Sequence, residues 1–154
     1  MRIETIEYNN ERLAYIIRKE IEIEEKEFFG SPDDFLQIGY MNLKKGEILK
    51  PHIHKPQNKI ITENQEVLYI VSGKMKVNFY NRIPQQISEA ILTDGDLIVL
   101  SAGGHGFEFL EDTKMIEVKQ GPYTGRDDDK EILEIKKWYL YANRFCLVTK
   151  ENMF

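Results

Sequence analysis

The chain has 154 residues, of which 42% are apolar and 31% charged, and its 21 basic and 26 acidic side chains give a formal net charge of −5. This length suits one domain with a proper core, so we treat 1–154 as a single domain. The composition excludes a disordered chain, a collagen-like repeat and a disulfide-rich scaffold. Nucleic-acid-binding proteins usually carry a basic surplus or stripe, and this chain has neither, so we expect no nucleic-acid partner.

Cysteine usage and the absence of targeting segments favour the cytoplasm. Cys146 is the sole cysteine, so no intrachain disulfide can form, and a single thiol fits a reducing compartment, where it is typical of a buried small apolar residue. The first ten residues, MRIETIEYNN, lack the apolar run of a signal peptide. No stretch approaches the roughly 20 apolar residues of a membrane span. We therefore expect a cytoplasmic protein without a membrane partner.

Alternating apolar residues dominate the chain, and turn residues interrupt them every 8–12 positions. This pattern predicts many short antiparallel strands, as in a sandwich or barrel. We expect strands at 2–8, 12–19, 35–43, 48–54, 66–72, 74–80, 86–92, 97–101, 105–110 and 113–120, with 131–139 as an open alternative. The polar segment 125–130 either caps a helix near Glu131 or joins two strands, and the aromatic tail from Trp138 to Phe154 covers a barrel end or a subunit contact.

The segment from Arg18 to Glu27 (RKEIEIEEKE) is rich in acidic residues. It fits either a cation-binding patch or a solvated edge strand whose charges prevent sheet-to-sheet association. We favour the edge strand.

A two-residue turn at Ser72-Gly73 predicts a hairpin with two distinct faces. One face carries Glu66, Leu68, Ile70, Met75, Val77 and Phe79; the other carries Val67, Tyr69, Val71, Lys74, Lys76 and Asn78. The first face is apolar apart from Glu66, so we expect it to be the interior, where a carboxylate must be paired, hydrogen-bonded or bound to metal. On the outer face, the row of Val67, Tyr69 and Val71 favours either an interface with a second copy or cover by another part of the same chain.

The three histidines are the most informative residues. His52 and His54 are two apart, so on a strand they share one face, and His105 begins another strand after a glycine pair. Three neutral imidazoles and the Glu66 carboxylate match one divalent transition metal, which can be Fe, Mn, Zn, Ni or Co, better than Ca²⁺. The alternative is three unrelated histidines that act as surface groups or hydrogen-bonded core residues.

Two segments resemble the motifs of the cupin family. Gly46-Glu-Ile-Leu-Lys-Pro-His52-Ile-His54, followed by Glu66 and Gly73, is similar to the first motif, G-x5-H-x-H-x3–4-E-x6-G. The run Gly95-Asp-Leu-Ile-Val-Leu-Ser101-Ala-Gly103-Gly104-His105 is similar to the second, G-x5-P-x-G-x2-H-x3-N. The resemblance covers about residues 35–121, leaving N-terminal strands in 1–34 and an extension in 122–154.

This sequence departs from the family pattern at several positions. Eleven residues, in place of three or four, separate His54 from Glu66, and we interpret 55–65 as a longer loop at the barrel mouth. Glu63 is a rival carboxylate ligand, but only Glu66 keeps the six-residue step to Gly73. In the second motif, Ser101 stands in place of proline, one residue is missing before the histidine, and Phe109 stands in place of asparagine.

The resemblance implies a conical antiparallel β-barrel, the jelly-roll-like double-stranded β-helix, together with frequent homodimers. It also implies a metal held at the positions of His52, His54, Glu66 and His105. The segment Val118-Lys-Gln-Gly-Pro-Tyr123 further resembles small cupins found with polysaccharide or sugar-nucleotide biosynthesis genes, which implies a sugar-like substrate.

Strand pairing suggests which residues line the pocket. A two-residue turn at Glu111-Asp112 turns Ile116 and Val118 inward, with Gln120 beyond them, and places Glu117 and Lys119 outside, although a one-residue slip reverses this assignment. Phe107, Gln120 and Lys50 are the pocket candidates. Each also has a structural interpretation: Phe107 as core, Lys50 as a rim residue and Gln120 as a strand-end hydrogen bonder.

The function expected from this site is that of a small-molecule metalloenzyme, an isomerase, epimerase or dioxygenase acting on a sugar or sugar-nucleotide-like substrate. Open metal positions would let adjacent substrate oxygens chelate, and the metal would act as a Lewis acid. Two alternatives remain, a noncatalytic cupin that binds a small ligand and a metal-free barrel that performs base-catalysed isomerisation. The sequence does not identify a general base.

Overall fold

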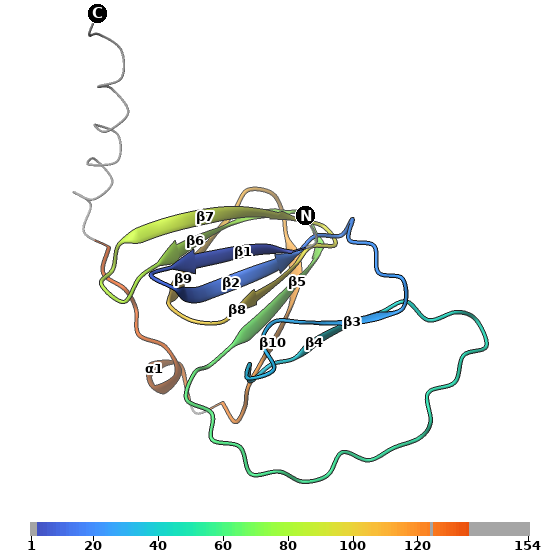
Figure 1. The fold of residues 1–154 in the computed structure, drawn as a ribbon. Coiled ribbons are helices and arrows are strands. Elements are labelled where there is room, and N and C mark those ends of the chain that lie inside the picture. The colour runs from blue at the N-terminus through green and yellow to red at the C-terminus, as the bar shows by residue number, and fades with distance from the viewer. Residues whose placement is uncertain (1–2, 124, 136–154) are drawn as a thin grey trace, which may run out of the picture.

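The computed structural model of the chain describes residues 3–123 and 125–135, and these form ten strands and one helical turn (Figure 1). The strands are β1 Glu4–Tyr8, β2 Glu11–Ile17, β3 Lys26–Phe29, β4 Ile38–Met41, β5 Glu66–Ser72, β6 Lys74–Tyr80, β7 Gln86–Thr93, β8 Leu97–Leu100, β9 Gly104–Phe109 and β10 Lys114–Lys119, and the turn is α1 Arg126–Asp129. The expected all-β, antiparallel class is confirmed. Within the described residues no sheet closes on itself, so the conical barrel stays a prediction.

The strands form three antiparallel sheets. A five-stranded sheet has the order β1-β2-β8-β5-β10, a three-stranded sheet the order β7-β6-β9, and β3 pairs with β4 alone. Alternate residues of β2, β5 and β8 are buried on opposite faces of the five-stranded sheet. This sheet is therefore the middle layer, with the three-stranded sheet on one face and the β3–β4 hairpin on the other.

The main core lies between the five-stranded and three-stranded sheets. Its buried members include Leu68, Ile70, Met75, Val77 and Phe79, the five apolar residues expected to face the interior. That prediction is confirmed. On the opposite face, Val67 is buried in a second core with Tyr15, Phe29 and Val99. Tyr69 and Val71 remain exposed. Of the three residues in the outer row, Val67 is therefore the one that another part of the described chain covers.

The chain crosses between sheets where hairpins were expected. β5 pairs with β8 and β10, whereas β6 pairs with β7 and β9, so neither the β5–β6 nor the β9–β10 hairpin forms. Gly73 makes one crossing with a φ of 98°, and a side chain there would collide with the carbonyl oxygen of Asp112. The two crossings lie against each other, because the N–H of Leu110 donates to the carbonyl oxygen of Lys74 at 2.9 Å.

The pairing of β10 with β5 reverses the expected register. Lys119 stands opposite Glu66, so both lie on the inner face, and Met115 packs against the main core. Ile116 and Val118 lie on the outer face, where each is more than half exposed. The expectation that Ile116 and Val118 point inward and Lys119 outward was wrong, because it rested on a β9–β10 hairpin.

Residues 48–54 form no strand, which corrects a second expectation. Every residue from 39 to 64 is exposed. Figure 1 shows that the chain between the end of β4 and the start of β5 extends away from the sheets as a long loop. A strand needs a neighbour that accepts its hydrogen bonds, and Pro51 and Pro56 have no N–H to donate. His52 and His54 therefore do not share an inward-facing strand surface.

Two other segments differ from the sequence expectation or lie outside the described part. Residues 18–25 form no edge strand, and regular pairing begins only at Lys26. The polar segment 125–130 contains the turn α1, and 131–135 contain no strand. The rest of the 131–139 alternative, the aromatic tail and Cys146 lie outside the described residues.

Candidate functional site

Glu66 is the first residue of β5 and lies on the inner face of the five-stranded sheet, in line with Leu68. Its side chain lies at the end of the main core, and the residue is 8% exposed. A carboxylate buried to this extent costs free energy unless charged or hydrogen-bonding groups surround it. Of the three arrangements expected for Glu66, which were pairing, hydrogen bonding and metal binding, the structure shows pairing with cationic side chains.

His105 is the first of these partners. It lies on β9, opposite Phe79 of β6, and its Nε2 atom lies 3.3 Å from Oε2 of Glu66. Because β9 and β5 belong to different sheets, the pair joins the two sheets at one end of the main core. A quarter of the His105 side chain is exposed, which leaves the imidazole accessible to a small molecule.

Lys130 is the second partner. Its Nζ atom lies 3.4 Å from Oε1 of Glu66, so the two carboxylate oxygens face different cations. The chain is held here by a neighbouring ion pair, in which Nζ of Lys119 donates to Oδ2 of Asp129 at 2.7 Å. The segment after β10 therefore returns across the end of the core and covers part of the Glu66–His105 pair.

These partners keep Glu66 ionised. The hydrogen bond from His105 is the largest effect and lowers the pKa of Glu66, burial opposes it, and the charges of His105 and Lys130 add to the lowering, which brings the pKa to about 2. A carboxylate facing Nε2 favours the imidazole tautomer that carries its proton on Nε2. In neutral His105 the lone pair is then on Nδ1.

Two of the expected pocket residues lie near this pair. The ring of Phe107 lies 5.3 Å, centroid to centroid, from that of His105, and Phe107 also packs against the main core. Gln120 has a structural contact, because its Oε1 accepts a hydrogen bond of 2.8 Å from the N–H of Gln65. Its Nε2 is buried and has no hydrogen-bond partner within the described part of the chain.

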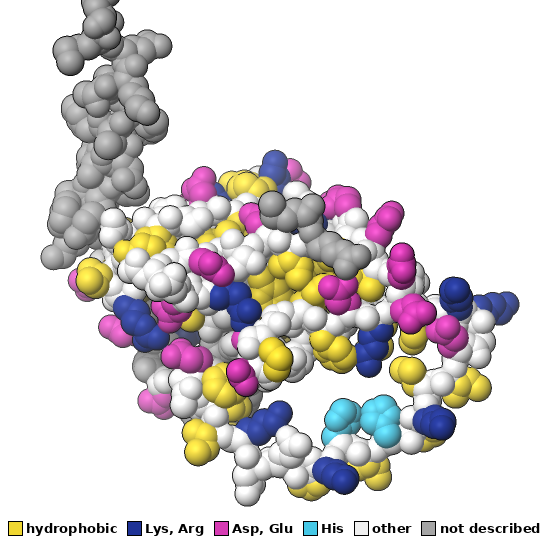
Figure 2. All heavy atoms as spheres, viewed as in Figure 1, with side chains coloured by type: hydrophobic (Ala, Val, Ile, Leu, Met, Phe, Trp, Pro, Cys, Tyr) yellow, Lys and Arg dark blue, Asp and Glu magenta, His cyan; other side chains and the backbone are white. Residues whose placement is uncertain are grey.

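The structure places the remaining predicted residues away from the pair. Lys50, His52 and His54 lie on the exposed loop between β4 and β5, and Figure 2 shows histidine side chains on this loop, standing off from the body. The rings of His52 and His54 are 5.1 Å apart, and Nδ1 of His52 donates to the carbonyl oxygen of Lys50 at 2.9 Å. Glu63, the rival carboxylate, pairs with Arg82 at 3.3 Å.

The donor set fits a transition metal only in part. Glu66 and His105 supply an oxygen and a nitrogen at one place, which suits such an ion, but His52 and His54 lie elsewhere. Across residues 3–123 and 125–135, no three His, Cys, Asp or Glu side chains are grouped so as to hold a metal ion. The four-ligand centre therefore stays a prediction.

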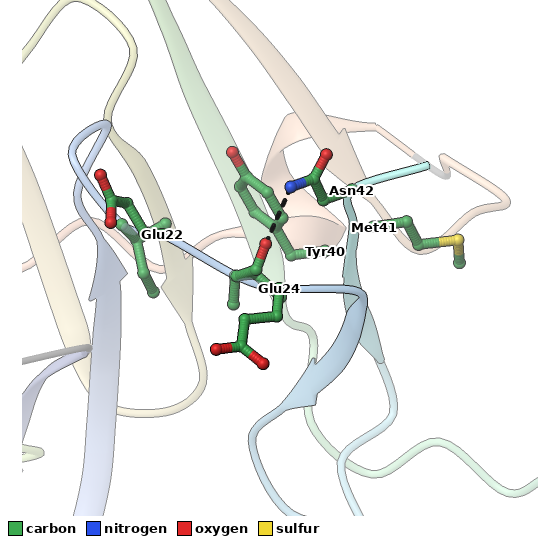
Figure 3. Close-up of a pocket in the computed structure, with 7 residues that line it drawn as sticks. Glu22, Glu24, Tyr40, Met41 and Asn42 are labelled. Atoms are coloured by element: carbon green, nitrogen blue, oxygen red, sulfur yellow. Dashed lines mark hydrogen bonds between the residues drawn. The ribbon is translucent and has the colours of Figure 1, made fainter. Parts of the chain in front are cut away.

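A separate open groove of about 680 Å³ lies at the edge of the β3–β4 hairpin (Figure 3). One wall is the segment 21–24 and the other is Tyr40, Met41 and Asn42. The amide of Asn42 crosses between the walls and donates to the carbonyl oxygen of Ile23 at 3.0 Å. The groove contains none of the residues that the sequence singled out for catalysis.

No protein-family model matches this chain, and neither the curated proteins nor the solved structures provide a significant match. Among the described residues, no helix is long and apolar enough to cross a membrane.

Sequence reasoning did not identify Lys130, Lys119 and Asp129 as neighbours of Glu66. Lys119 could have been found from strand parity, because it faces Glu66 once β10 is paired with β5. Lys130 and Asp129 are in a polar turn that carries no periodic signal, so nothing in the sequence placed them here.

Proposed function

We propose that this protein is a small-molecule isomerase or epimerase whose reactive centre is the Glu66–His105 pair. The observation that carries the proposal is the 3.3 Å contact between a buried carboxylate and a partly exposed imidazole. Such a dyad supplies an imidazole of fixed tautomer, which is the usual requirement for a general base.

In the proposed reaction, Nδ1 of His105 removes the proton from a carbon next to a substrate carbonyl. Two electrons of the broken C–H bond form the enediolate, and the proton becomes the second N–H of an imidazolium. The charge of Glu66 stabilises this imidazolium through the proton on Nε2. Return of the proton to the former carbonyl carbon, while the hydroxyl proton of the first carbon passes to the former carbonyl oxygen, gives the isomer. Return of the proton to the opposite face of the first carbon, after the enediolate turns over in the site, gives the epimer.

The substrate class that we propose is a sugar or a sugar-nucleotide-like molecule, which is what the cupin resemblance implies. A hydroxy-ketone provides the acidified C–H bond that this chemistry needs. The cupin fold itself is part of the proposal, as are a homodimer, a cytoplasmic location and the absence of nucleic-acid and membrane partners. A noncatalytic ligand-binding role is the alternative to catalysis.

A second candidate is a metal centre of His52, His54, Glu66 and His105. It is favoured by the two ready donors at the Glu66–His105 pair and by the adjacent imidazoles of the loop. The eleven residues 55–65 that join His54 to Glu66 can span up to roughly 36 Å, so this chain length does not prevent closure. A bound divalent transition metal would supply Lewis-acid chemistry, or oxygen chemistry if it were iron.

The experiment incubates the purified protein with a panel of aldoses, ketoses and nucleotide-linked keto sugars in deuterium oxide. NMR spectroscopy then follows exchange of the carbon-bound proton and formation of the isomer. We expect exchange in the presence of a chelator, and a loss of about 10²–10⁴-fold in His105→Gln and Glu66→Gln. Glu63→Gln, which changes a carboxylate outside the pair, is the matched control.

Activity that a chelator abolishes and one metal restores would favour the second candidate. Ligand binding without exchange on any member of the panel would favour the noncatalytic role. Full activity in His105→Gln would overturn the proposed base.

A further inference from the structure

The loop of residues 43–64, called the basic loop below, exposes an unusual amount of apolar surface. All of its residues are exposed, including Ile48 at 85%, Ile53 at 92% and Ile60 at 87%, together with Leu43, Leu49 and Ile61. Soluble proteins rarely expose large contiguous apolar surface unless it binds something. The basic loop therefore fits a partner surface.

Its charge indicates which kind of surface. The basic loop carries five lysines and two glutamates, a net charge of +3, which leaves −8 on the rest of the chain. Figure 2 shows lysine and hydrophobic side chains interleaved along it. The complementary partner is an apolar surface bordered by carboxylates.

The groove beside the β3–β4 hairpin has that character. Tyr40 and Met41 supply exposed apolar side chains on one wall, and Glu22 and Glu24 supply carboxylates on the other (Figure 3). The side chains of Ile21 and Ile23 belong to the second core beneath the groove. We call it the acidic groove. The same chain thus carries two surfaces of opposite charge, and the basic loop starts where the acidic groove ends, after Asn42.

The groove of the same chain is poorly placed to receive its own loop. The N–H of Asn42 donates to the carbonyl oxygen of Glu25 at 2.6 Å, and its side-chain amide holds Ile23. These bonds fix the direction of the chain as it leaves the groove, so the loop would have to turn back on itself to return. A second copy related by a two-fold axis avoids this reversal and fills both grooves together.

The size also suits a dimer. In a symmetric exchange each copy contributes at most the 22 residues of its basic loop and the seven that line its groove, which is within the 20–30 residues per side, about 800 Å² per partner, of a standard stable interface. We propose that two copies of this chain associate by exchange, with the basic loop of each copy lying in the acidic groove of the other.

The first test is disulfide trapping in a Cys146→Ser background. Ile53→Cys protein is mixed with Glu24→Cys protein, oxidised, separated on a non-reducing gel, and the joined peptides are identified by mass spectrometry. We expect a covalent dimer that joins positions 53 and 24. The matched control replaces Glu24→Cys by Glu89→Cys, an exposed position on the three-stranded sheet, and should trap far less.

Placing both cysteines in one chain distinguishes docking of the basic loop on a second copy from docking of the loop in the groove of its own chain. A disulfide that forms within a monomer of the double variant, with no trapping between the two single variants, would overturn the proposal in favour of the chain's own loop. Disulfide-linked dimers with peptides from both copies would support it.

The second test is sedimentation velocity over a concentration series. We expect the parent to dimerise and a triple variant, Ile48→Asp, Ile53→Asp and Ile60→Asp, to sediment as a monomer with an unchanged circular-dichroism spectrum. Ile83→Asp, at an isoleucine that is 75% exposed between β6 and β7, should leave the dimer intact. A monomeric parent would overturn the proposal, and so would a parent monomer that co-sediments with phosphatidylcholine–phosphatidylserine vesicles through the same three isoleucines.

Discussion

Glu66 and His105 meet across two sheets, with 3.3 Å between the carboxylate Oε2 and the imidazole Nε2. β5 brings one residue and β9 the other, and no hydrogen-bonded ladder joins these strands. The contact therefore depends on how the two sheets pack. Their shared core fixes the pair, and any change that shifts one sheet against the other will alter the distance.

The pH dependence of stability should report this contact. A fall in the pKa of Glu66 from 4.5 to about 2 corresponds to about 3 kcal/mol of stabilisation. Because the folded-state value is the lower one, this stabilisation is complete above pH 4.5 and is lost as the pH falls towards 2. Urea unfolding in the presence of a chelator measures it, with Glu66→Gln as the reference. The two free energies of unfolding should converge below pH 4.5, and parallel curves would contradict the assignment.

Gly73 should be far less tolerant of a side chain than Gly46. Both glycines have a positive φ, 98° at Gly73 and 95° at Gly46. A Cβ at Gly73 would collide with the carbonyl oxygen of Asp112 and would lie 2.8 Å from Cα of Thr113. A Cβ at Gly46 would have no atom within 4 Å. We expect Gly73→Ala to lower the free energy of unfolding by about 3 kcal/mol or more, and Gly46→Ala by about 1 kcal/mol. Equal losses in chemical denaturation would show that the crossing between sheets is not tightly packed.

The alternation of apolar residues predicted much of this fold correctly. The inner face of β5 and β6 was identified from the alternation of apolar residues within each strand, with the inner set changing from even to odd positions across the connection at Gly73, whichever strand each pairs with. Pairing partners could not be found in the same way. Short turns at 72–73 and 111–112 fit a hairpin as well as a crossing between sheets, and only the packing of the two crossings against each other distinguishes them.

Of the four residues predicted to form the site, two lie at it and two do not, for a similar reason. Glu66 stood out as the single charge on an apolar face, and His105 as a histidine at a strand start, and both lie at the pair. His52 and His54 were assigned by assuming a strand, whereas the described loop has no ladder partner. Periodicity measures which residues share a face of a strand, but not whether that strand forms.

Tyr15 gives a stability prediction away from the site. Burial, with a smaller effect from Asp34, raises the pKa of Tyr15 to about 12, while Arg12 opposes the rise. The hydroxyl is buried with no hydrogen-bond partner in the described residues. Tyr15→Phe should therefore be neutral or stabilising by up to about 1 kcal/mol at pH 7, because it removes an unpaired polar atom.

The dependence of stability on pH above 10 distinguishes the burial of an unpaired hydroxyl at Tyr15 from a change in packing. Below pH 10 the phenol is neutral in both states, and above it the unfolded chain ionises first, so the parent loses stability between pH 10 and 12. Tyr15→Phe lacks this contribution and should lose less. Identical alkaline curves, measured by urea unfolding at each pH, would contradict a raised pKa.

His52→Ala tests the metal candidate without disturbing the fold. His52 lies on the exposed loop and contacts only local groups in the described structure, so we expect its loss to change the free energy of unfolding by less than about 0.5 kcal/mol. If the four-ligand centre forms, the variant should lose most of the metal that elemental analysis finds in untagged parent protein. Because imidazoles must be neutral to bind, metal retention in the parent should also decline below about pH 6.5. Equal metal content in parent and variant, or retention that stays flat from pH 7.5 to 5, would remove His52 from the centre and leave the Glu66–His105 pair to act alone.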